Sequence, residues 1–205
     1  MKSDAQKAAG RATSRRLSGA ERRRQLLDTA LLIVREEGAD RLTLGHLAAR
    51  AGVSKPVAYD HFGTRSGLLI ELYRWIDMER VNAFRDTMTT SERSLEEGVG
   101  VLAAAYIHCA ADRTDEFHAV GAALAGSEEK AAVFQEVLDN SVRMFVSVLR
   151  HHATSSTTGL ERPCIGLVGA GEAVSTAIVG GQSDEAETIQ AFSSLIQGGL
   201  REPQR

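Results

Sequence analysis

The sequence predicts an all-α protein of about nine helices, and three observations support this fold class. Ala, Leu, Glu, Arg and Gln dominate the long segments, and these residues favour helices. Val, Ile, Thr and Tyr never gather into the alternating runs that would indicate strands. Only three prolines occur in 205 residues, so little in the chain interrupts helix formation. The 43% hydrophobic and 25% charged residues are typical of a folded globular protein.

The chain begins with a segment that predicts a disordered arm, and a first helix follows it. Residues 1–17 are polar and basic and show no apolar period, so we expect them to be disordered. Ser18 and Glu21 have the spacing of a capping box immediately before an apolar run, which indicates a helix start. Gly38 then predicts the end of this helix. The basic residues of the arm are Lys2, Lys7, Arg11, Arg15 and Arg16.

Formal charge is divided unevenly along the chain. Residues 1–75 carry a net charge of +6, whereas residues 76–205 carry −9. A basic head on an acidic body favours a polyanionic partner, such as nucleic acid, for the head alone.

Two short helices joined by a tight turn are expected next. Thr43 is a good cap for the first of them, and Ser54 is expected to cap the second, with Pro56 in its first turn. Gly52 lies where the turn requires a positive φ, and Gly63 predicts the end of the second helix. The polar residues of that helix are Lys55, Tyr59, Asp60 and His61, with Val57 among them. The pattern predicts a helix-turn-helix, whose second helix enters the major groove of DNA.

The remaining chain predicts a helical body. A long fourth helix is expected to begin after Thr64, and a polar loop is expected over 151–162. The other expected helices are 94–109, with a capping box at Ser94 and Glu97, then 115–126, 127–149, 163–180 beginning at Pro163, and 184–200.

One stretch of the predicted helix-turn-helix indicates a protein family more specifically than the spacing of its caps and turn does. It reads Lys55-Pro56-x-x-Tyr59-x-His61-Phe62, then Arg65 before Leu68-Leu69, and it follows Leu47-Ala48 and Ala51-Gly52-Val53-Ser54. With Ala30, Gly38 and the Thr43 cap upstream, residues 20–73 resemble the DNA-binding domain of the TetR family of transcriptional regulators. Ala58 stands where a larger aliphatic residue is usual, and Gly45-His46 replaces charged residues. The body carries no family-wide motif.

The resemblance implies a dimeric transcriptional regulator, most often a repressor, that binds a palindromic operator in double-stranded DNA and is released by a small-molecule effector. It implies a DNA-binding domain over 18–63 and an effector-binding and dimerisation domain over 64–205. It also implies that Thr43, Tyr59, His61 and Arg65 hold the phosphate backbone, while Ser54, Lys55, Pro56 and Val57 face the bases. Residue chemistry agrees, since Lys55 can donate to guanine and Asp60 could accept from cytosine or remain solvated.

An effector pocket in such a body would lie between its fourth and seventh helices. Its expected lining is Trp75, Met78, Phe84, Met88, Tyr106, Phe117, Met144 and Phe145. Plain core packing is the alternative for each of these residues. The composition of the set favours a hydrophobic ligand with one polar group.

The last two helices are expected to form a homodimer interface, as the resemblance implies. Small residues at helical spacing indicate close approach of another helix, and packing on the chain's own helices is the alternative. The small-residue stripe is Gly166, Ala170, Ala173, Ala177 and Gly180, and the last helix adds Ile189, Phe192, Ile196 and Leu200.

Other functional classes find less support in the sequence. Gly166, Gly169 and Gly171 do not form a dinucleotide loop, because Val174 occupies the third glycine position and no strand precedes them. We therefore expect no cofactor, no metal and no enzymatic activity. A helical enzyme or metal-binding protein using His108, Cys109 and His118 is the alternative from a different class.

The expected location is the cytoplasm. No apolar stretch has the length of a membrane span or the features of a signal peptide. Cys109 and Cys164 are too few for a disulfide framework, which indicates reduced thiols.

Overall fold

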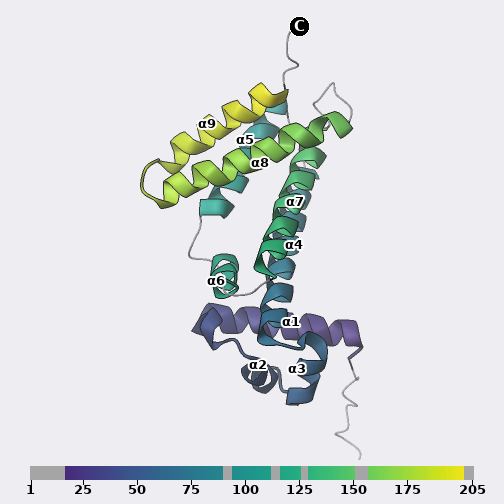
Figure 1. The fold of residues 1–205 in the computed structure, drawn as a ribbon. Coiled ribbons are helices and arrows are strands. Elements are labelled where there is room, and N and C mark those ends of the chain that lie inside the picture. The colour runs from purple at the N-terminus through teal and green to yellow at the C-terminus, as the bar shows by residue number, and fades with distance from the viewer. Residues whose placement is uncertain (1–16, 90–93, 112–115, 126–128, 151–156, 201–205) are drawn as a thin grey trace, which may run out of the picture.

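The computed structural model describes residues 17–89, 94–111, 116–125, 129–150 and 157–200. These residues form nine α-helices and one 3-10 turn, and no strand occurs among them, so the predicted fold class is confirmed. The first three helices form a domain at one end of the molecule, and α8 and α9 cross the other end (Figure 1). The predicted arm, residues 1–17, lies outside the described residues except for Leu17.

The N-terminal domain consists of α1 (Gly19–Glu37), η1 (Ala39–Arg41), α2 (Leu44–Arg50) and α3 (Lys55–Phe62). The predicted capping box is present at the start of α1: the Ser18 hydroxyl accepts from the backbone N–H of Glu21, whose carboxylate accepts from the N–H of Ser18. Gly38 ends α1 with a φ of +87°, which favours glycine because it has no Cβ. The Thr43 hydroxyl caps α2 by accepting from the N–H of His46 at 3.1 Å.

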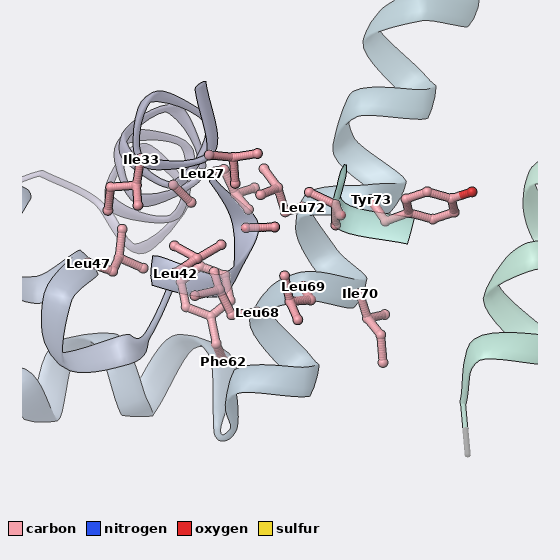
Figure 2. Close-up of a cluster of buried hydrophobic side chains, with 14 of the residues drawn as sticks. Leu27, Ile33, Leu42, Leu47, Phe62, Leu68, Leu69, Ile70, Leu72 and Tyr73 are labelled. Atoms are coloured by element: carbon pink, nitrogen blue, oxygen red, sulfur yellow. The ribbon is translucent and has the colours of Figure 1, made fainter. Parts of the chain in front are cut away.

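Helix α4 (Arg65–Thr89) connects the N-terminal domain to the body. Thr64 caps its first turn by accepting from the N–H of Gly67 at 3.0 Å. Leu68, Leu69 and Leu72 are buried in the core of the N-terminal domain, where side chains from α1, α2, α3 and α4 converge (Figure 2). The same core cluster continues into α6 and α7, so the expected boundary at residues 63 and 64 divides residues that pack together.

The body contains α5 (Leu95–Ala111), α6 (Glu116–Ala123), α7 (Lys130–Leu149), α8 (Thr157–Val179) and α9 (Glu185–Leu200). Ser94 and Glu97 form the second predicted capping box. Asp184 caps α9 by accepting from the N–H groups of Ala186 and Glu187. A second core cluster, which includes Tyr106, Phe145 and Phe192, holds α5, α7, α8 and α9 together.

Two local expectations were wrong. Helix α8 begins at Thr157 rather than at Pro163, which lies in its second turn. Leu160 and Cys164 are buried one turn apart, so tertiary packing offsets the hydrogen bond that proline removes. Ser54 stands at the N-cap of α3 but makes no side-chain cap bond. Pro56 has no N–H to donate, and the N–H of Val57 donates to the backbone oxygen of Ser54 at 3.1 Å.

The last two helices divide the predicted interface residues between core and surface. Phe192 and Ile196 on α9 are buried in the chain's own second core cluster, and Ile189 and Leu200 pack against it. The apolar stripe of α9 therefore follows the alternative interpretation of intrachain packing. On α8, by contrast, Gly166 and Ala173 are exposed, and Ala170 and Ala177 are half-buried. Gly180, directly after the helix, is exposed as well.

Candidate DNA-binding surface and ligand cavity

The turn between α2 and α3 fixes the angle of the two helices. Gly52 adopts a φ of +66°, and the N–H of Val53 donates back to the carbonyl oxygen of Ala48 at 3.0 Å. Ala48 and Ala58 are buried where the helices approach one another. A small residue at position 58 thus serves close packing of α3, and the departure from a larger aliphatic residue does not disturb the fold.

The outward face of α3 is the polar surface that the sequence predicts. Lys55, Pro56 and Tyr59 are exposed, and 53% of Tyr59 is accessible. Val57 and His61 are half-buried beside them. The side chains that hold α3 to the domain point the other way, so the exposed residues are not required for the core.

Arg23 on α1 anchors the C-terminal end of α3. Its guanidinium donates to the backbone oxygen of His61 at 3.0 Å and lies 5.4 Å from the ring centre of Phe62. It also pairs with Glu71 on α4 at 2.5 Å. Sequence analysis did not identify this residue, because a bond between positions 38 residues apart leaves no local pattern.

Arg65 makes two hydrogen bonds inside the N-terminal domain. Its Nε donates to the carbonyl oxygen of Leu42 at 2.9 Å, and Nη2 donates to that of Ala39 at 3.0 Å. The guanidinium thus holds η1 and the start of α4 together. The resemblance implies a phosphate contact for this residue, and the structure gives it an intramolecular role.

A cluster of charged groups connects α1 with α2. Glu37 accepts from His46 Nε2 at 3.0 Å and from Arg50 at 2.8 Å, and Arg50 also pairs with Glu36 at 2.6 Å. The hydrogen bond from His46 holds the pKa of Glu37 below its ordinary value, with support from the charge of Arg50.

A cavity of about 870 Å³ lies in the body and is lined by residues of α4, α5, α6, α7 and α8. Of the eight residues expected to line a pocket, Phe84, Tyr106, Phe117 and Met144 do so. The other four are placed elsewhere: Trp75 lies under the guanidinium of Arg24, Met78 is 51% exposed, Phe145 is fully buried in the second core cluster, and Met88 is outside the lining.

Charged and aromatic residues of α4 line the cavity. Tyr73 stacks on Phe117 of α6 with 4.1 Å between ring centres, and Arg80 lies 4.7 Å from the same ring. Arg80 also donates to the sulfur of Cys109 at 3.1 Å. Burial raises the pKa of Asp77, while the hydrogen bond from Asn140 and the charge of Arg80 oppose this shift.

A second polar pair lies where α5 meets α8. The Tyr106 hydroxyl donates to Glu172 Oε1 at 2.8 Å, and both residues line the cavity. Burial and the nearby carboxylate raise the pKa of Tyr106 far above its ordinary range. Sequence analysis did not assign Glu172 a role, although a lone carboxylate in an apolar helix was a signal that could have indicated one.

The residues of the enzyme or metal-binding alternative do not form a centre. His108, Cys109 and His118 all line the cavity, but His108 is directed to solvent and pairs with Glu185 of α9 at 3.1 Å. Within the described ranges, no group of three or more His, Cys, Asp or Glu side chains could hold a metal ion. The structure therefore does not favour this alternative.

Residues 26–72 match the model of a protein family described as bacterial regulatory proteins, tetR family. Among curated proteins, none shows significant sequence similarity to the chain. None of the described helices is long and apolar enough to cross a membrane.

Three solved structures illustrate the similarity of fold. A TetR-like transcriptional regulator from a Rhodococcus species is 23% identical with a TM-score of 0.53, over 90% of this chain and 98% of that chain. The fatty acid degradation regulator FadR from Bacillus halodurans is 20% identical with a TM-score of 0.58, over 89% and 97%. FadR from Bacillus subtilis, in complex with stearoyl-CoA, is 16% identical with a TM-score of 0.54, over 86% and 97%.

The family match covers the helix-turn-helix with parts of α1 and α4, and the fold similarity extends over most of the chain. Residues 26–72 therefore form a helix-turn-helix domain of the tetR family of bacterial regulatory proteins.

Proposed function

We propose that the chain is a homodimeric repressor that binds a palindromic operator through α3 and leaves it when an effector enters the body cavity. The observation that carries this proposal is the position of α4, which contributes to both sites. Tyr73 of α4 belongs to the core of the N-terminal domain and also lines the cavity. A ligand that moves Tyr73 would therefore act on the packing of the DNA-binding domain.

The exposed face of α3 supports the DNA-binding part of the proposal. Lys55 and Pro56 lie at the N-terminal end of α3, which is the end that meets base edges in helix-turn-helix proteins. We assign Ser54, Lys55, Pro56 and Val57 to the bases. Thr43, Tyr59 and His61 would contact the phosphate backbone, and Arg65 would support that surface through η1.

Contacts between α6 and the N-terminal domain support the coupling. Arg35 of α1 pairs with Glu116 at the start of α6. Phe117, the next residue, lines the cavity and stacks on Tyr73. Effector binding that displaces α6 would therefore act on α1 and α4 together. In a dimer, this would change the spacing of the two α3 helices.

The outward face of α8 supports a two-fold interface. Ile165 of α8 is 56% exposed, and Leu195 of α9 is 50% exposed. An exposed apolar face with Gly166 and Ala173 allows a second copy of the helix to approach closely. Binding to a palindrome requires such an interface between identical patches.

Duplex DNA selected from a random pool tests the proposal. The full chain is used to enrich binding sequences, and their affinity is measured by fluorescence anisotropy at increasing salt. We expect a palindromic consensus and an affinity that falls steeply with salt, because phosphate contacts release counterions. Failure to enrich any sequence would contradict the operator-binding role. In a bacterial cell the operator would lie in cytoplasmic DNA, so the proposed role implies a cytoplasmic location.

A further inference from the structure

The carboxylate of Glu172 stands out among the polar groups of the cavity. It lies in the C-terminal half of α8 and lines the cavity, and it accepts the O–H of Tyr106 at 2.8 Å. Within the described part of the chain, no Lys, Arg or His makes an ion pair with it. A carboxylate facing a largely apolar cavity without a cation is costly in free energy, and a positively charged ligand would offset this cost.

Close packing holds the carboxylate and the phenol together. A Cβ at Gly171 would lie 2.4 Å from Cε1 of Tyr106, so the ring occupies the space of the missing side chain. Phe145 and Phe192 contact the ring on other sides, with 5.3 Å and 5.8 Å between ring centres. The Tyr106 hydroxyl is therefore fixed beside the next residue of α8, which is Glu172.

The charges of Arg80 and Glu172 both act on Tyr73, but the side-chain contacts of Arg80 are with other residues. Arg80 contacts Phe117 and Cys109, and its charge acts on Asp77 and Glu116. Lys130 begins α7, whereas Tyr106 lies beside Phe145 near the end of that helix. Met144 lies 14 residues after Lys130 on α7, which corresponds to about 21 Å, so the cavity extends along α7. Glu172 lies beside Tyr106, away from the start of α7.

We propose that Glu172 and Tyr106 recognise the ammonium group of an amphipathic organic cation, whose apolar tail lies along α4 and α7. This inference rests on the proposed role of the cavity as the effector site. The tail would contact apolar residues such as Phe84, Val137 and Leu138, which line the cavity. Aromatic rings near the carboxylate add attraction for a cation, whereas an anionic head group would meet a like charge.

Three probes, each with a chain of ten carbons, test which head-group charge the cavity prefers. Decyltrimethylammonium is permanently positive, 1-decanol is neutral and decanoate is negative. Each is titrated into the full-length protein by calorimetry, below its micelle concentration. We expect the ammonium compound to bind about tenfold or more tightly than the alcohol, and decanoate to bind the most weakly. The ammonium compound should also release the protein from its selected DNA duplex.

Glu172→Gln keeps the size of the side chain and an oxygen that accepts from Tyr106. This variant should lose about tenfold or more in affinity for decyltrimethylammonium and retain its affinity for 1-decanol. Retained alcohol binding shows that the cavity is intact. Glu161→Gln is the matched control, because Glu161 is exposed on the same helix and lies outside the cavity lining.

The outcomes separate this inference from the proposed function. Decanoate or 1-decanol binding as tightly as the ammonium compound, or unchanged ammonium affinity in Glu172→Gln, would overturn the assignment of Glu172 while leaving the cavity as an effector site. Failure of all three probes to bind would overturn both the assignment and the effector role of the cavity.

Discussion

The ring of Tyr106 lies directly against the backbone of Gly171, and a Cβ at position 171 would come within 2.4 Å of Cε1 and 3.0 Å of the Phe192 ring. Gly171 lies inside α8 and has no positive φ. Glycine is therefore required here for the close approach of the ring and not for an unusual backbone conformation. Gly166 and Gly169 lie on the same helix, and a Cβ at either position would meet nothing within 4 Å. The three glycines of this segment therefore have different structural roles.

Gly171→Ala is expected to destabilise the chain by about 1–3 kcal/mol, because the added methyl group overpacks a region that cannot expand easily. Urea unfolding measures this change. Gly100→Ala is the control, since a Cβ at position 100 of α5 meets nothing within 4 Å. The control should be neutral or slightly stabilising, as alanine favours a helix more than glycine does. Equal stability of the two variants would contradict the close packing.

Arg65→Ala is expected to lower the free energy of unfolding by about 1.5–3 kcal/mol in the absence of DNA, because the carbonyl groups of Ala39 and Leu42 lose a charged donor. Arg41→Ala, an exposed change on η1, should have little effect. Denaturant unfolding of both variants tests this. If Arg65→Ala is as stable as the parent but binds DNA weakly, the residue acts mainly on phosphate.

Lys55→Ala is expected to leave stability unchanged and to reduce specific DNA affinity by about 1–3 kcal/mol if the lysine pairs with guanine. The variant should also discriminate less between bases at one position of the operator. Competition among the selected duplexes measures this preference. Tyr59→Phe provides the comparison, because loss of a phosphate contact should weaken binding to all sequences alike. Unchanged affinity and preference in Lys55→Ala would exclude this residue from base readout.

The free energy of unfolding should fall as pH drops below the ordinary Glu37 value of 4.5, because the pKa of Glu37 is lower in the folded chain. The stabilisation by its carboxylate is fully present above that value and is lost as pH falls through the folded pKa. In the Glu37→Gln variant, the free energy of unfolding should decrease less over the same pH range. Unfolding curves between pH 3 and pH 7 test it, and an unchanged pH profile would contradict the role of the His46–Glu37 bond.

Ala173→Arg is expected to yield a helical monomer that no longer binds the palindrome, because a long charged side chain does not fit between closely packed helices. Sedimentation velocity measures the assembly state, and circular dichroism verifies that the helices remain. Ala132→Arg on the exposed side of α7 is the control and should leave the assembly unchanged. A tight dimer of the Ala173 variant would place the interface elsewhere.

Local sequence determined most of the secondary structure. Ser18, Thr43, Thr64 and Asp184 cap helices as their positions predict, since capping depends on residues within one turn. Gly52 likewise has the positive φ that its turn requires. The helix-turn-helix and its family were recognisable for the same reason, because their pattern lies in one continuous segment.

Tertiary structure decided which apolar residues form core and which line a cavity. Phe84 and Phe145 have similar chemistry, yet Phe84 lines the cavity and Phe145 is fully buried, because their neighbours come from distant parts of the chain. The partners of Arg65 and Glu172 also depend on how separate helices pack. The start of α8 before Pro163 has the same origin, since burial of Leu160 outweighs the local effect of proline.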